Sequence, residues 1–98
     1  MDKNEYRRLK HKVEKFGELL QEGKELEQKI EEVKEIKDKY ESIYIDFKDT
    51  PYYLDFDAKS DIPQRIYMAI VNILETKVKE IVSEMESLWS EVLYEKYN

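Results

Sequence analysis

The chain has 98 residues, of which 41% are charged and 41% are hydrophobic, and it carries a formal net charge of −6 and no cysteine. This length predicts one small domain over residues 1–98, and the apolar content argues against intrinsic disorder. The lack of cysteine excludes disulfides, thiolate metal ligands and a thiol nucleophile. With only two glycines and two prolines, the composition favours an all-α fold.

The first part of the chain predicts one long amphipathic helix over about residues 4–41. Its apolar residues lie mostly three or four positions apart, the spacing of a helix that packs on another helix: Tyr6, Leu9, Val13, Phe16, Leu20, Leu26, Ile30, Val33, Tyr40 and Ile43. This stripe turns about twice as far around the helix as a regular heptad, which drifts about 20° per seven residues. We therefore expect a bend or a break at Gly23, since glycine costs about 1 kcal/mol relative to alanine inside a helix. A three-helix arrangement split at this glycine is the alternative.

Basic side chains dominate the start of this helix. Residues 1–15 carry six Lys or Arg and three acidic residues, a net charge of +3. Within about 100° of the helix surface, on the side opposite the first apolar turn, lie Arg7, Arg8, His11 and Lys15. These side chains can converge on a phosphate or another anion, and a solvated charged surface is the alternative. The single histidine lacks a cluster of further ligands, so we predict no metal site.

A Tyr/Asp-rich insert follows over about residues 42–60. Apolar and polar residues alternate on both sides of an Asp-Thr-Pro turn signal at residues 49–51, which is typical of a β-hairpin. An ordered loop whose aromatics plug one end of a helical bundle remains the alternative. The insert and the residues after it also form an acidic surface: Asp46, Asp49, Asp55, Asp57 and Asp61.

A second helix is predicted over about residues 62–95. Asp61 can cap it, Pro63 fits its first turn, and Gln64 can complete a capping box. Its apolar residues form two neighbouring stripes, whereas one partner helix covers about one stripe. The second stripe therefore predicts self-association, most simply through a symmetric four-helix core. The residues predicted at this interface are Tyr67, Val71, Leu74, Val78, Val82, Met85, Trp89 and Leu93.

Together these elements predict two long antiparallel helices, joined by a loop or short hairpin, that assemble into an even-numbered oligomeric bundle. The order of helix, hairpin and helix is similar in architecture to that of a prefoldin-type subunit. The apolar second helix, which lacks a heptad pattern, departs from that architecture.

The sequence contains no Gly-rich phosphate loop and no Ser–His–Asp arrangement, so we expect neither an enzyme nor a cofactor. The longest apolar stretch, residues 66–74, is too short to span a membrane, and the N-terminus lacks a signal-peptide pattern. These features predict a cytoplasmic protein. The cytoplasm of an infected host cell is one such location.

We expect a homo-oligomer that acts by binding another macromolecule, as an adaptor, an assembly factor or an inhibitor. A phage-encoded inhibitor of a host enzyme or defence system is one form of this hypothesis. The first alternative is a sponge for an anionic small molecule such as a nucleotide, bound by the basic N-terminal face. The second is an acidic mimic of nucleic acid. Direct binding of nucleic acid is not expected, because the aromatic insert is acidic rather than basic.

Overall fold

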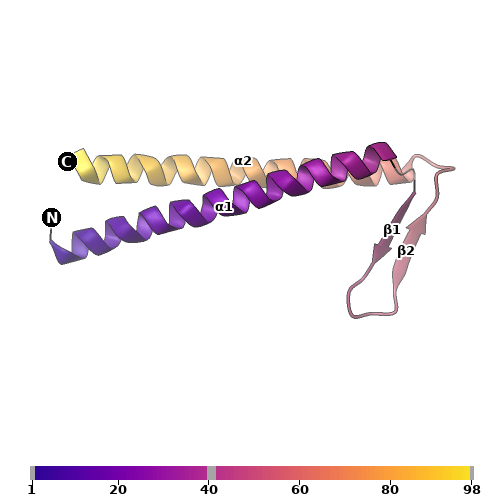
Figure 1. Ribbon diagram of the computed structural model, residues 1–98, viewed down its shortest axis with the longest axis horizontal. Coiled ribbons are helices and arrows are strands. Elements are labelled where there is room, and N and C mark those ends of the chain that lie inside the picture. The colour runs from indigo at the N-terminus through magenta and orange to yellow at the C-terminus, as the bar shows by residue number, and fades with distance from the viewer. Residues whose placement is uncertain (1, 40–41, 98) are drawn as a thin grey trace.

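The computed structural model describes residues 2–39 and 42–97. Helix α1 (Lys3–Lys39) leads through strands β1 (Ile43–Asp46) and β2 (Tyr53–Phe56) into helix α2 (Ile62–Tyr97). The helices run antiparallel, with both chain termini at one end and the strands at the other (Figure 1). The molecule is elongated, with extents of 64 × 27 × 15 Å. The prediction of two long helices with a short connection is confirmed, and the connection is a hairpin.

Helix α1 begins at a cap that the sequence prediction missed. The carboxylate of Asp2 accepts the backbone N–H of Glu5 at 2.8 Å, and its carbonyl accepts the N–H of Tyr6 at 3.0 Å. An Asp followed three residues later by a Glu is a capping-box pattern. The cap satisfies donors that the first helical turn leaves without partners.

The helix continues without interruption through Gly23, so the predicted break, and the three-helix arrangement with it, is wrong. Gly23 faces α2, where an added Cβ atom would lie 3.6 Å from the Cγ2 atom of Ile81. Leu19 and Ile30, on either side of this glycine, are buried. Burial of such side chains contributes about 1.5–3 kcal/mol each, which outweighs the lower helix propensity of glycine.

The two strands pair antiparallel, with Ile43 opposite Phe56 and Ile45 opposite Leu54. The predicted alternation is therefore confirmed, and one face of the hairpin is apolar. The turn closes through a hydrogen bond from the Thr50 N–H to the Phe47 carbonyl at 3.1 Å. Asp49 takes a positive φ of 63° in this turn, a conformation that Asp tolerates better than most residues.

Helix α2 begins at Ile62, with Asp61 at the cap position as predicted. The Asp61 carbonyl accepts the N–H of Arg65 at 3.1 Å, and its carboxylate binds the Nε of Arg65 at 2.7 Å. The side chain of Asp61 thus pairs with a helix residue one turn on. Pro63 is buried in the first turn, where its missing N–H has no helical partner to lose.

Buried side chains occupy only part of the helix pair. The buried hydrophobic residues of the described chain are Leu19, Ile30, Tyr67, Val71 and Ile81. All of them lie in residues 19–39 or 62–81, which we call the closed half of the helix pair. The remaining segments, residues 3–18 and 82–97, form the open half at the end with the termini (Figure 1). No helix in the described part of the chain is long and apolar enough to cross a bilayer.

Candidate binding surfaces

Exposed apolar side chains gather at the open half of the helix pair. We call this surface the open-end face; it consists of Tyr6, Val13, Val82, Trp89 and Leu93 of the open half and of Leu20 at the boundary with the closed half, all of them exposed. Trp89 is 52% exposed and Tyr6 is 58% exposed. Contiguous exposed apolar patches are typical of surfaces that bind other molecules, so this face is a candidate binding surface.

A shallow apolar groove runs along this face between the helices. It has a volume of about 400 Å³ and is lined by Phe16, Val82, Met85, Glu86 and Trp89. The rings of Phe16 and Trp89 lie 6.0 Å apart between centroids, within the range of a favourable aromatic pair. The groove is therefore built by both helices, with the aromatic pair in its lining.

The structure divides the interface predicted for α2. Tyr67 and Val71 are buried against α1 within one chain, so they have little area left for a second copy. Half-buried positions follow at Leu74, Val78 and Met85. Val82, Trp89 and Leu93 are exposed. The interface remains a prediction, and only its C-terminal part is accessible in a single chain.

The sequence prediction did not place Tyr6, Val13 and Leu20 on an exposed surface, because they had been assigned to the seam between the helices. Their spacing of seven residues holds them on one side of α1. The signal that could have revealed them is the excess rotation of the apolar stripe. One partner helix cannot follow such a rotation, so one part of the stripe is left in water.

The predicted anion-binding residues are all exposed on α1: Arg7, Arg8, His11 and Lys15. At about 100° per residue, they lie on the side of α1 that carries Lys12, away from the open-end face. Lys12 pairs there with Glu91 of α2 at 3.5 Å. The basic residues thus share a side of the molecule but remain in open solvent.

The predicted acidic residues are distributed over the hairpin and its base. Asp46 lies opposite Tyr53 and Asp55 lies opposite Tyr44, which places these four side chains on one face of the hairpin. Asp49 lies in the turn. At the base, Asp57 accepts the backbone N–H of Lys59 at 2.9 Å, and Asp61 pairs with Arg65. The structure therefore brings together Asp46 and Asp55 but not the whole set.

The hairpin, residues 43–56, projects from the end of the helix pair (Figure 1), and we call it the hairpin arm. The rings of Tyr44 and Tyr53 stack on its polar face with centroids 5.3 Å apart, and each tyrosine is 59% exposed. On its apolar face, Phe47 and Leu54 are exposed. At its base the Tyr67 hydroxyl donates a hydrogen bond to the Ser42 carbonyl at 3.0 Å.

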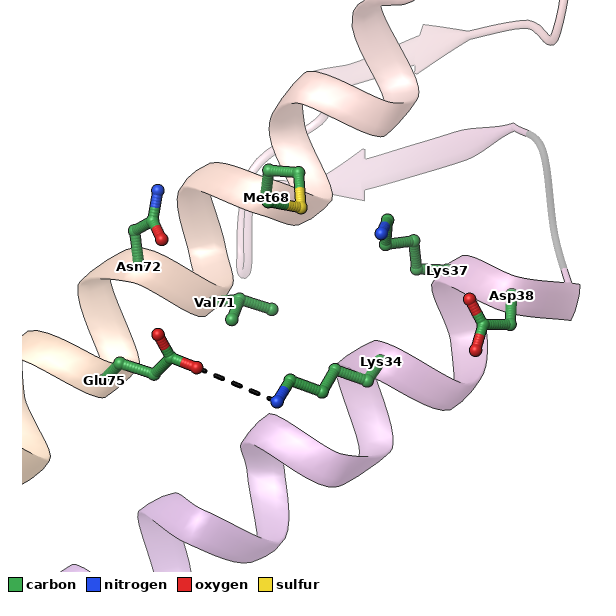
Figure 2. Close-up of a pocket in the computed structure, with 7 residues that line it drawn as sticks. All are labelled: Lys34, Lys37, Asp38, Met68, Val71, Asn72 and Glu75. Carbon is green, nitrogen blue, oxygen red and sulfur yellow. Dashed lines mark ion pairs between the residues drawn. The ribbon is translucent and has the colours of Figure 1, made fainter.

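A second groove, of about 360 Å³, crosses the closed half near the hairpin arm. In Figure 2 the side chains of Lys34 and Glu75 point toward each other across it, with 3.8 Å between the Nζ and Oε1 atoms. Lys37, Asp38 and Asn72 also line this groove. Met68 and Val71 line it as well, so its lining is mixed, with four charged side chains and one ion pair, whereas the groove of the open half is mainly apolar.

Among residues 2–39 and 42–97, no group of three His, Asp or Glu side chains could hold a metal ion. Within the same residues, every buried side-chain nitrogen or oxygen has a hydrogen-bond partner. The described surface offers an apolar face and an aromatic, acidic arm, both of which suit macromolecular contacts.

The architecture has the order helix, hairpin, helix that the sequence predicts. No protein-family model matches the chain, and comparisons with curated proteins and with solved structures find no match.

Proposed function

We propose that this protein is a non-enzymatic binding module, a homo-oligomer of helical hairpins that presents the hairpin arm to another protein. The observation that carries the proposal is the arm itself. A two-stranded hairpin is marginally stable alone in water, yet this one stands away from the helices. Five of its aromatic or aliphatic side chains are more than half or nearly half exposed: Tyr44, Phe47, Tyr52, Tyr53 and Leu54. Such a surface gains stability when a partner covers it.

The chemistry of the polar face of the arm fits a basic segment of a protein. Tyrosine rings and carboxylates alternate there, since Tyr44 faces Asp55 and Asp46 faces Tyr53 across the strands. A guanidinium group can stack on an aromatic face and also bind a carboxylate through two parallel hydrogen bonds. We therefore expect arginine-rich segments to bind better than lysine-rich ones.

The test is a binding measurement with a short fluorescent peptide in which arginine and serine alternate. Fluorescence anisotropy at low ionic strength should detect binding, and a lysine–serine peptide should bind more weakly. The double variant Asp46→Asn, Asp55→Asn keeps the shape of both side chains and should lower the affinity about tenfold. The matched control is Glu27→Gln, Glu31→Gln, which removes the same charge from exposed positions of α1 and should change the affinity less than twofold.

An equal loss in both double variants would mean that the net charge of −6, rather than the arm, attracts the peptide. Replacing Tyr44 and Tyr53 with leucine should also weaken binding, whereas replacing both with phenylalanine should preserve it, because phenylalanine keeps the ring faces. Loss of binding in the phenylalanine variant would exclude the stacking role of the rings.

This activity suits an adaptor, an assembly factor or an inhibitor that occupies a basic surface of its target in the cytoplasm, including a phage inhibitor of a host protein. An acidic mimic of nucleic acid is a narrower version of the hypothesis that the protein binds a basic surface of its target. It requires the partner to be a nucleic-acid-binding protein, and competition by double-stranded DNA for that partner would identify it.

A second candidate function is capture of an anionic small molecule by Arg7, Arg8, His11 and Lys15. The observation that favours it is that all four side chains are exposed on one helix over about two turns. Nucleotides should then raise the melting temperature, and Arg7→Gln with Arg8→Gln should abolish that rise without changing helicity. If nucleotides still raise the melting temperature of this double variant, the basic residues do not form the binding site and belong to the solvated surface.

A further inference from the structure

The open-end face continues across both helices on one side of the molecule. At about 100° per residue, Tyr6, Val13 and Leu20 lie about 40–80° beyond Phe16 around α1, away from Lys12. On α2, Val82 and Leu93 lie about 20–40° beyond Trp89, away from Glu91. The Phe16–Trp89 contact and the Lys12–Glu91 ion pair therefore mark opposite edges of the helix pair, and the apolar residues share the aromatic edge.

The helix pair is a single layer that lacks a second layer to bury this face. Stable domains pack at least two layers of secondary structure around a core. In the open half, no described side chain is buried, and Trp89 is half exposed although it contacts Phe16. The described chain has no further helix to supply the second layer.

The exposed area suits a partner copy. A whole aromatic side chain offers about 150–250 Å², so six half-exposed large side chains offer several hundred Å². Stable protein interfaces bury about 800 Å² per partner, and the charged rim of the face can supply the remainder. A second copy carries the same face, and a two-fold axis lets each face cover the other.

Charge decides how two copies are oriented. Residues 2–15 of α1 carry a net charge of +3, whereas residues 80–94 of α2 carry a net charge of −4. Most of these charged side chains lie away from the open-end face, but Lys10 lies about 40° from Tyr6 around α1, and Glu86 of α2 lines the apolar groove. A two-fold axis along the helices places α1 of each copy over α2 of the other. An axis across the helices places α1 over α1 and α2 over α2. The first arrangement brings opposite charges together, and the second brings like charges together.

We propose that the open-end face binds a second copy of this chain in a parallel two-fold dimer, a four-helix bundle in which basic α1 segments lie over acidic α2 segments. Both hairpin arms then project from the same end of the dimer. The inference rests on the proposed self-association and specifies its surface and orientation. A partner with two basic segments binds such a dimer bivalently, which strengthens binding without a new contact.

The first test separates the two sides of α2. Val82→Glu places a charge in the open-end face and should convert the protein to a monomer at low-micromolar concentration, measured by light scattering. Ile73→Glu is the matched control, because Ile73 is 67% exposed and lies about 160° around α2 from Trp89. The control should remain dimeric. A dimer that survives Val82→Glu, or that is lost equally in both variants, overturns the assignment of the face.

The second test reports the orientation. The chain has no cysteine, so Lys48→Cys in the hairpin turn accepts one spin label per copy. Electron–electron dipolar spectroscopy should give a distance between the two labels shorter than the 64 Å length of one molecule. A longer distance overturns the parallel arrangement while leaving self-association intact. A monomeric wild-type protein overturns both, and arginine-peptide binding by that monomer would still support the role of the arm.

Discussion

The closed and open halves of the same helix pair are packed differently. Near the hairpin arm, α1 and α2 bury Ile30, Tyr67 and Val71 against each other. Toward the termini the same two helices leave Val13 and Trp89 in solvent. The helices continue through both halves, so helix formation does not explain the difference. The position of the apolar stripe explains it, because the stripe on α1 rotates relative to the partner helix along its length.

The same two helices therefore bury their apolar side chains against each other in one half and leave apolar side chains exposed in the other. In the closed half, the buried side chains hold α1 and α2 together within a single molecule. In the open half, part of the apolar surface of the same helices is exposed. The following changes test this division, beginning with the largest expected effect.

Replacing Ile81 with alanine should damage the closed half most. Ile81 is 2% exposed and lies against Gly23 at the boundary of the two halves, so the substitution leaves a cavity. We expect the free energy of unfolding to fall by about 2–5 kcal/mol, measured by urea denaturation at a fixed protein concentration. Ile73→Ala, at an exposed site on the same helix, should change it by about 0.5 kcal/mol or less. Equal effects would show that α1 does not bury Ile81.

Replacing Trp89 with alanine should act on assembly rather than on the closed half. Trp89 is the largest side chain of the open-end face, and large aromatics anchor interfaces. We expect the dimer to weaken by about 2 kcal/mol or more, measured by sedimentation equilibrium. In the assembled wild-type protein, the Trp89 fluorescence should be that of a buried indole. Emission typical of a fully exposed indole would contradict the assignment of the open half to the contact between copies.

Replacing Gly23 with alanine should strengthen the closed half. The added methyl group would lie 3.6 Å from the Cγ2 atom of Ile81, an ordinary contact distance, while alanine favours the helix by about 1 kcal/mol. We expect a gain of about 0.5–1 kcal/mol in the free energy of unfolding. Gly17→Ala, whose methyl group meets nothing within 4 Å, measures the helix-propensity term alone. A loss at Gly23 with a gain at Gly17 would reveal a tighter contact than the structure describes.

Replacing Glu75 with glutamine should have the smallest effect. The Lys34–Glu75 pair spans the helices in the closed half (Figure 2), but both side chains are about half exposed. Such pairs contribute about 0–1 kcal/mol and are screened by salt. We expect a change of about 0.5 kcal/mol or less in chemical denaturation, and a smaller one at high salt. A loss of several kcal/mol would show that charge, rather than burial, holds the closed half together.

Much of the fold could be predicted from local patterns. The alternation of Ile43 and Ile45 with polar residues left a hairpin and an ordered loop as alternatives, and the structure has the hairpin. The start of α2 after Asp61 was also predictable, because a first-turn proline acts within one helical turn. The predicted capping by the Asp61 side chain is not what the structure shows, since its carboxylate binds Arg65. Of the two alternatives at Gly23, a bend or a break, the break is wrong, because the helix propensity of one residue was weighed without the packing of its neighbours.

The candidate surfaces were only partly predictable. The sequence identified Val82, Trp89 and Leu93 as apolar residues beyond the reach of one partner, and their exposure agrees with that expectation. It could not separate them from Tyr67 and Val71, which lie on the same stripe but are buried by α1. Nor could it show that Tyr6 and Val13 join the exposed side, because exposure depends on where the partner helix lies.

The sequence by itself determined the elements: two helices, the alternating strands between them, and more apolar surface than two helices can bury. These features arise from periodicity, capping and turn residues, which act over a few positions. Only the tertiary structure decided which part of each apolar stripe is buried. That choice depends on the relative rotation of the two helices, and this rotation is set by contacts such as Gly23 against Ile81 between residues far apart in the chain.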